Sequence, residues 1–486
     1  MCKKIVIAAI VSICLVFTGC SAGQPKEEEK QINVKETGRQ EKNNTKADNT
    51  LKEKENTKNN NLQLLCKESM RFMSEAGYYY ITADSKELKG DLWGRHIMYM
   101  DFATKQEVYL CAEPGCKHND KKCTAVLPEA EFGGEPLIFV CNDTLYVVSR
   151  NSNQKGSSTV VFWEDESNNS LIGNGIKVDD GTSEMPVVLY SMGLDGTNRT
   201  KEYTFEQDIN LDSVVLYDGK DLYFVANKTN ISSDKNTTYH TTSDCELVKY
   251  QTKDSKLANV CSLEFGDNVR WNIVGCYNNN VILQGRKYNG NLTFEEQMKL
   301  ENEEGWEYEN DSKDMYVKLD LTQESIKEVY SIENDPNSSN GVQILGDYLY
   351  VSQEKTGTIE KVDMETGKIQ NFATLKQSAI FGSLSNKLCC GSWEQGDETI
   401  YFADVNSGKI DHCTLVNHYN GEALKIIGET GNQVLVIYDW DAEEVKDLKG
   451  QDAWEVKRYQ YGLINKTDLY QSKDCFEKIE MKGTGE

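Results

Sequence analysis

Residues 345–372, LGDYLYVSQEKTGTIEKVDMETGKIQNF, decide the fold that the sequence predicts. The apolar run YLYVS follows the polar turn LGD, and the later segments TIEKVD and IQNF flank the tight turn METGK. Turn residues between two strand-like segments are typical of a β-hairpin. The stretch therefore predicts a short apolar strand behind a polar turn, followed by a hairpin.

These two patterns alternate along the chain, seven times each. The hairpin pattern occupies 96–110, 186–203, 245–260, 314–330, 357–372, 398–413 and 455–471. The apolar strand pattern occupies 76–84, 141–149, 217–226, 277–284, 345–352, 384–392 and 430–439. About four strands per repeat is the size of a propeller blade. We therefore expect an all-β fold, a seven-bladed β-propeller over 62–486, with six or eight blades as alternatives and with 62–75 or 475–482 closing the ring.

The N-terminus predicts export. A lysine pair precedes an apolar run from Ile5 to Phe17, which is the layout of a secretory signal over residues 1–19 and is too short to span a membrane. The run ends in FTGC, which resembles the lipobox of bacterial lipoproteins. That resemblance implies that Cys20 becomes the new N-terminus, carries diacylglycerol and anchors the chain at the extracytoplasmic face of the cell membrane. An ordinary secreted protein is the alternative.

Residues 20–61 are expected to be the lipidated cysteine and a disordered stalk. Positions 21–61 hold no aromatic residue and nine basic against eight acidic residues, so the segment cannot bury enough apolar surface to order itself. Because the chain's net charge is −25 and residues 1–61 carry +3, residues 62–486 carry −28. So acidic a domain argues against nucleic acid as a partner.

The fragments LYSMGLDGTNR (189–199) and VDMETGK (362–368) resemble TolB-like and YWTD-type propeller repeats. The whole layout resembles a group of uncharacterised propeller lipoproteins of anaerobic Firmicutes, with a lipobox, a polar stalk and a cysteine cluster after the first hairpin. That resemblance implies surface attachment and little more about function, because propellers host many unrelated activities.

The cysteine cluster is CAEPGCKHNDKKC, residues 111–123. Cys111, Cys116, His118 and Cys123 form a complete tetrahedral set for a structural Zn²⁺, and Pro114–Gly115 can turn the chain so that they converge. A disulfide such as Cys111–Cys116 or Cys116–Cys123 is an alternative that an exported chain permits, and free thiols are a third. Four further cysteines fall in predicted strands as small buried residues: Cys261, Cys276, Cys389 and Cys390.

Blade connectivity predicts one decorated face. If the strands of a blade are named A to D outward from the axis, the B–C loops and the D–A links emerge together. The B–C loops carry the insertions, at 150–186, 227–245, 286–313 and 440–455, and the cysteine cluster lies on the first D–A link. The candidate ligand face holds five tryptophans that fall in or beside these loops: Trp163, Trp306, Trp393, Trp440 and Trp454. Tryptophan beside carboxylates can stack on a sugar or hold a basic peptide, or it can simply pin long loops to the rim.

No catalytic motif stands out. The chain has no G-x-S-x-G elbow, P-loop, G-x-G-x-x-G or H-E-x-x-H, and its five histidines form no nucleophile arrangement. We therefore expect a surface lipoprotein that binds a peptide, glycan or protein partner without catalysis. The alternatives are an extracellular carbohydrate-active enzyme and an assembly module for another envelope complex.

Overall fold

The computed structural model describes residues 62–90, 92–150, 158–165, 170–178, 186–206, 209–233, 239–263, 269–288, 312–323, 325–333, 340–353, 356–376, 378–392, 396–446 and 452–482. The expected signal peptide, Cys20 and the stalk to residue 61 lie outside these residues. Among the described helices, none has the length and apolar character that crossing a membrane requires.

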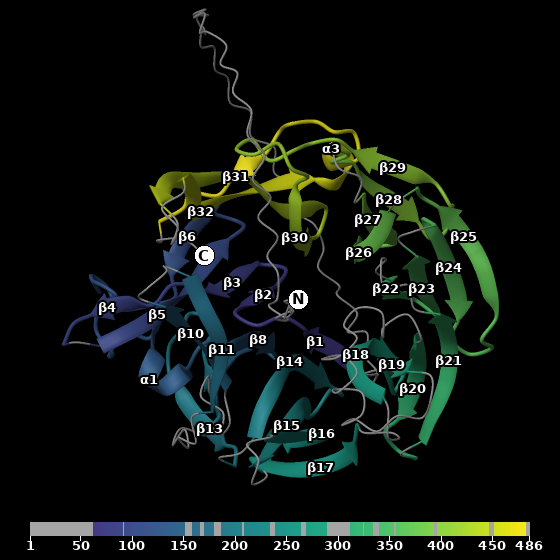
Figure 1. The fold of residues 1–486 in the computed structure, drawn as a ribbon. Helices are drawn as coiled ribbons and strands as arrows, with labels where there is room; N and C mark the ends of the chain where they lie inside the picture. Colours follow the sequence, from purple (N-terminus) through teal and green to yellow (C-terminus); the bar gives the residue numbers. More distant parts are fainter. Residues whose placement is uncertain are drawn as a thin grey trace, which may run out of the picture. The chain divides into compact units, whose positions relative to one another are not determined.

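Seven antiparallel sheets follow one another in chain order around a ring, which confirms the seven-bladed propeller (Figure 1). Blade 1 consists of β2 (Arg71–Met73), β3 (Gly77–Ile81), β5 (Leu92–Asp101) and β6 (Gln106–Tyr109). Blade 2 consists of β8 (Leu137–Cys141), β9 (Thr144–Val148), β12 (Val188–Met192) and β13 (Thr200–Thr204). Blade 3 consists of β14 (Ile209–Tyr217), β15 (Leu222–Ser233), β16 (Tyr239–Gln251) and β17 (Lys256–Ser262).

The remaining blades repeat this order. Blade 4 consists of β18 (Val269–Tyr277), β19 (Asn280–Tyr288), β20 (Ser312–Asp320) and β21 (Ser325–Glu333). Blade 5 consists of β22 (Asn340–Leu345), β23 (Tyr348–Gln353), β24 (Thr358–Asp363) and β25 (Ile369–Thr374). Blade 6 consists of β26 (Ser378–Leu384), β27 (Lys387–Ser392), β28 (Ile400–Asp404) and β29 (Ile410–Cys413). Blade 7 consists of β30 (Lys425–Thr430), β31 (Gln433–Lys446), β32 (Asp452–Asn465) and β33 (Glu477–Lys478).

The blades pack face to face through apolar residues of their middle strands. Between blades 1 and 7, for example, Tyr80 and Met98 share a buried cluster with Leu435 and Leu463. A β-bulge recurs in the outer strand pair of blades 2, 3, 4 and 5. Because a bulge increases the local twist of a strand pair, this repeated irregularity helps each outer strand follow the twist of its blade.

Both ends of the domain contribute to closing the ring, but no strand is exchanged between its first and last blades. Strand β2 is the innermost strand of blade 1, and β33 is the outermost strand of blade 7. Residues 479–482 then cross to blade 1, where the amide of Glu107 donates to the carbonyl of Glu480 over 2.9 Å. In Figure 1 the C-terminal end accordingly lies beside β6.

Strand β1 (Gln63–Cys66) pairs with β14, the innermost strand of blade 3, as an additional fifth strand in that sheet. Gln63 lies opposite Tyr217, at the end of β14 that leads into the A–B turn. The chain therefore enters the ring on the side of the A–B and C–D turns, which is the side opposite the B–C loops. The sequence did not predict this strand separately from the closing segment.

The B–C insertions are largely extensions of the blade hairpins themselves. Strands β15, β16, β31 and β32 run for 12 to 14 residues, whereas the strands of blades 5 and 6 run for 4 to 7. In blade 2 the insertion forms a separate hairpin of β10 (Ser158–Asp165) and β11 (Ser170–Val178). Blade 1 has two short additional strands, β4 (Lys86–Leu88) and β7 (Val126–Pro128), both paired with the start of β5.

The hairpin predicted at 455–471 is wrong. Strand β32 continues to Asn465, the helical turn α3 (Lys466–Leu469) follows, and the outermost strand is β33 instead. The helical turn forms because Leu469 is fully buried in the core between blades 6 and 7, while Lys466 donates to the carbonyl of Gly431 over 2.8 Å. The other short helix, α1 (Glu129–Phe132), lies in the link between blades 1 and 2.

Candidate metal centre and candidate binding surfaces

The cysteine cluster lies in the link between blades 1 and 2, after β6 and before β8. The amide of Cys116 donates to the carbonyl of Glu113 over 3.2 Å and closes a β-turn around Pro114 and Gly115. Gly115 has a φ of +73°, a left-handed conformation that glycine adopts at no steric cost. The turn expected at Pro114–Gly115 is therefore confirmed, and it brings the cysteines on either side together.

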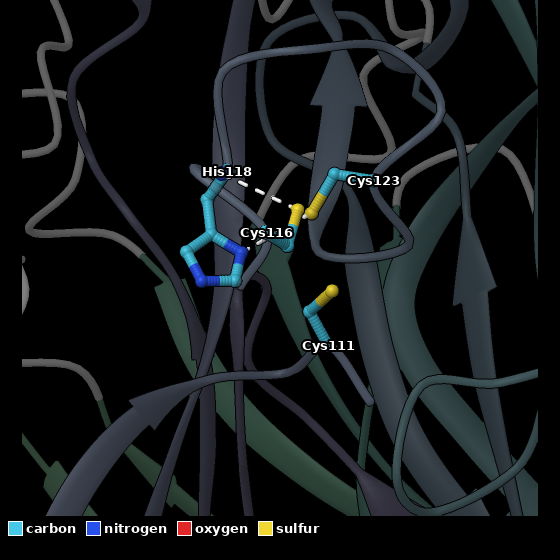
Figure 2. A group of neighbouring side chains, drawn as sticks. All are labelled: Cys111, Cys116, His118 and Cys123. Carbon is cyan, nitrogen blue, oxygen red and sulfur yellow. Dashed lines mark hydrogen bonds between the residues drawn. The ribbon is translucent and has the colours of Figure 1, made fainter. Parts of the chain in front are cut away.

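Figure 2 shows the four side chains of the cluster converging. Cys111, Cys116, His118 and Cys123 each offer one ligand atom, and these atoms all lie within 4.8 Å of one another. The Nδ1 atom of His118 is 3.4 Å from the Sγ atom of Cys123. Around a tetrahedral zinc ion, bonds of about 2.3 Å to sulfur and about 2.0 Å to nitrogen place neighbouring ligand atoms about 3.5 to 3.8 Å apart. Small side-chain shifts would therefore let this set enclose a Zn²⁺ ion.

His118 is positioned by two residues that are not ligands. His96 is 5% exposed and donates from Nε2 to the carbonyl oxygen of His118 over 2.6 Å. The ring of Tyr109 stacks on the imidazole of His118, with the ring centroids 4.3 Å apart. His118 itself has a φ of +52°, in the left-handed region that residues other than glycine rarely occupy. Together these contacts hold the unusual backbone and direct Nδ1 at the sulfur of Cys123.

The protonation of the cluster also suits a metal. Burial lowers the pKa of His118, which keeps the imidazole neutral at pH 7. Burial raises the pKa of Cys123 to about 12. Burial likewise acts to raise the pKa of Cys111, but hydrogen bonds from the backbone at Glu113 and from the thiols of Cys123 and Cys116 outweigh it and lower that pKa. Binding of a soft cation would thus displace at least the thiol proton of Cys123.

All twelve cysteines beyond residue 62 are free thiols in the structure. No disulfide joins Cys111, Cys116 or Cys123 in the structure, and the Cys111–Cys116 and Cys116–Cys123 pairings stay predictions. The four cysteines expected in strands lie in β17, β18 and β27. Cys389 and Cys390 are buried as expected, whereas Cys261 and Cys276 are only partly covered.

Of the five tryptophans predicted to form the ligand face, the structure describes the side chain of Trp440 alone. Its half-buried ring stacks on Tyr419 and meets Tyr459 edge-on, with both centroid distances 5.8 Å. Two partners thus hold this ring, which fits a tryptophan that pins a long hairpin to the rim. The side chains of the remaining four lie outside the described residues: Trp163, Trp306, Trp393 and Trp454.

The central channel contains two cavities that flank β1. One of about 550 Å³ is lined mainly by aliphatic residues of β14, β18 and β22. The other, of about 600 Å³, is lined by residues of β1, β2 and β30. Its carboxylate, Glu68, pairs with Arg71 at 3.1 Å. Histidine is not among the residues that line either cavity.

A third cavity, which the sequence analysis did not identify, lies between blades 1 and 2. It measures about 650 Å³ and contains tyrosines of β3 and β5 together with residues of neighbouring turns. Single residues such as Tyr79 gave no signal in the sequence, because only the packing of two blades places them beside turns more than a hundred positions away.

Comparisons with known proteins show the fold alone. No family model matches the chain, and no curated protein does. Among solved structures, TolB from Acinetobacter baumannii, a β-propeller protein, is 13% identical at a TM-score of 0.31, covering 83% of this chain and 81% of that one. A putative 6-phosphogluconolactonase from Bacteroides fragilis is 10% identical at a TM-score of 0.37, and the match covers 82% of this chain and 94% of that one. The acylaminoacyl peptidase of Pyrococcus horikoshii is 13% identical at 0.36, covering 68% of this chain but 44% of the peptidase.

Proposed function

We propose that this chain is a lipoprotein of the extracytoplasmic membrane face whose propeller binds a peptide, glycan or protein partner without catalysing a reaction. The observation that carries the proposal is the set of extended B–C hairpins. Strands β15–β16 and β31–β32 continue well beyond their blades, and β10–β11 adds a further hairpin in the same type of loop. Long hairpins on one side of a rigid ring form an extended surface of the kind that a macromolecular partner contacts.

The entry point of the chain agrees with this arrangement. Gln63, near the start of the described chain, lies on the side of the A–B and C–D turns, opposite the B–C hairpins. A coil of 41 residues would reach on the order of 35 Å. Anchoring at Cys20 is therefore compatible with a partner that approaches the B–C side from outside the cell.

The anchor is tested by metabolic labelling with an alkyne fatty acid. The full-length chain should incorporate the label and fractionate with membranes, and Cys20→Ala should lose both properties. Labelling that persists in Cys20→Ala would contradict the lipoprotein assignment.

The binding face is tested by site-specific photocrosslinking on intact cells. A crosslinking residue replaces Glu444 in the β31–β32 hairpin or, as the matched control, Thr366 in the C–D turn of blade 5. A discrete adduct from position 444 that is absent from position 366 supports the proposal. Equal adducts from both positions, or adducts from 366 alone, would overturn the assignment of this face.

We further propose that Cys111, Cys116, His118 and Cys123 hold a structural Zn²⁺. The donor set, its convergence within 4.8 Å and the neutral imidazole support a closed tetrahedral site. The ion would fasten a long link whose one described strand is the three-residue β7, paired with β5. The chain purified anaerobically without chelator should contain one zinc, which Cys111→Ser should lose and Cys475→Ser, at an exposed thiol outside the cluster, should keep.

A further inference from the structure

The cavity between blades 1 and 2 is a groove on the side of the ring opposite the B–C hairpins. Its lining includes the A–B turn of blade 1 at 74–76 and the C–D turn of the same blade at Asp101 and Thr104. The corresponding turns of blade 2 contribute Asp143 and Leu194. At about 650 Å³ it is large enough for one or two amino acid side chains together with the backbone between them.

Aromatic and aliphatic side chains form the wall of this groove. Tyr79 and Tyr99 pack with their ring centroids 4.6 Å apart, and the hydroxyl of Tyr79 donates to the carbonyl of Leu194 over 3.3 Å. Val108 and Leu194 are 37% and 38% exposed. The groove thus offers aromatic faces and two uncovered aliphatic side chains.

The charges around the groove all have one sign. Four of its sixteen lining residues are acidic, and none of the sixteen is lysine, arginine or histidine. The acidic residues are Glu75, Asp101, Asp143 and Asp195. A cation that enters would meet carboxylates and tyrosine rings together, a combination that attracts ammonium and guanidinium groups.

We propose that this groove binds a peptide segment that carries a lysine or arginine beside an apolar residue. The charged group would lie among the four carboxylates, and the apolar neighbour would cover Val108 and Leu194. A free polyamine provides the charge but has no side chain to cover these two residues, which is why a peptide is the better match. This site is separate from the B–C hairpins, so it stands or fails independently of binding there, and among the residues described it shares Cys111 with the proposed metal site.

The test measures binding of a fluorescein-labelled hexapeptide of alternating lysine and leucine to the full-length chain, by anisotropy at physiological salt. Glu75→Gln combined with Asp143→Asn removes two charges and keeps both backbone conformations, because asparagine tolerates the φ of +58° at position 143. The matched control is Glu328→Gln with Glu333→Gln, which removes two exposed charges from β21 of blade 4. We expect binding at least tenfold weaker in the groove variant and unchanged in the control.

Two further probes sharpen the test. Tyr99→Leu keeps an apolar side chain but removes the aromatic face, so it should also weaken binding, while a glutamate–leucine hexapeptide should not bind. The proposal is overturned if both double variants weaken binding equally, because the peptide would then sense only the net charge of −25. It is also overturned if spermidine displaces the peptide at the concentration at which unlabelled peptide does, because the site would then recognise charge alone.

Discussion

Among single residues, His96 helps to position His118, and its place in the sequence does not indicate this contact. It lies on β5, 22 residues before His118, and the pairing of β5 with the link brings its Nε2 to the carbonyl of that ligand. Spacing alone identified the four proposed ligands, because they fall within thirteen positions. It could not identify His96 or Tyr109, because their contacts with His118 depend on strand register.

Replacing His96 with Phe should weaken zinc binding by about tenfold to a hundredfold, the usual effect of losing a partner that orients a ligand. The ring volume in the buried site is kept, but the hydrogen bond to the carbonyl of His118 is lost. Competition with a chromophoric chelator measures the affinity, and His412→Phe, at an exposed position of β29, is the control. An affinity equal to that of the wild type would show that Tyr109 and the turn suffice to position His118.

Asp404 is one of several aspartates whose side chains accept backbone amides in the C–D turns. Its Oδ1 accepts the amides of Ser407 and Asn406 over 2.8 and 3.0 Å, and Asp101, Asp320 and Asp363 accept in the same way. The amide of Ser407, together with the other donors, lowers the pKa of Asp404 to about 2. Because a lowered pKa stabilises the fold above the pKa of the unfolded chain, this contribution is present above about pH 4 and is lost as the pH falls through 2.

We therefore expect Asp404→Ala to lower the free energy of unfolding by about 1 kcal/mol at pH 7. Asp404→Asn keeps the acceptor oxygen and should cost less. Both variants should lose less stability than the wild type between pH 4 and pH 2, since the titrating group is gone. Urea unfolding at pH 7, 4 and 2 measures this, and parallel pH profiles for all three proteins would contradict it.

Some strands and turns could be predicted from the sequence pattern, and others could not. Six of the seven hairpins could be predicted, because an apolar strand pair with a glycine or aspartate turn is a local signal. The last blade departs from the pattern because the helical turn α3, which buries Leu469 in the core between blades 6 and 7, comes between β32 and the outermost strand β33. Strand β1 could not be predicted as an element distinct from the closing segment either, since Gln63 pairs with Tyr217, which lies about 150 positions away.

The C-terminal segment is the element whose removal should affect the ring most. Ile479 is 3% exposed in the core between blades 1 and 7, and the amide of Lys482 donates to the buried carboxylate of Glu107 over 2.7 Å. Burying an isoleucine side chain contributes about 1.5 to 3 kcal/mol, and a bond to a buried charge about 1.5 to 3 kcal/mol. Deletion of 479–486 should thus cost about 3 to 6 kcal/mol of unfolding free energy, whereas deletion of 483–486 should leave the urea midpoint unchanged.

For the whole molecule, the B–C hairpins lie on one side of the ring, and the chain entry at Gln63 lies on the other. The acidic groove is lined mainly by the A–B and C–D turns of that second side, and it meets the proposed metal cluster at Cys111, in the link between blades 1 and 2. The apolar clusters between neighbouring blades, including the one that joins blade 7 to blade 1, connect all of these to a common core. A change that destabilises one blade should therefore destabilise its neighbours as well, so that the blades unfold together.

The free thiols allow the cooperativity of unfolding among the blades to be measured. Burial raises the pKa of Cys66, that of Cys141 to about 11 and that of Cys390 to about 12, so in the folded chain at pH 8 these three buried thiols are protonated. They lie in the sheets of blades 3, 2 and 6, whereas Cys475 is exposed. Alkylation mapped by mass spectrometry along a urea gradient should modify Cys475 without urea and the three buried thiols together, at the midpoint that circular dichroism reports. If the three thiols instead become reactive at separate urea concentrations, the blades unfold independently and the contacts that close the ring do not unite them.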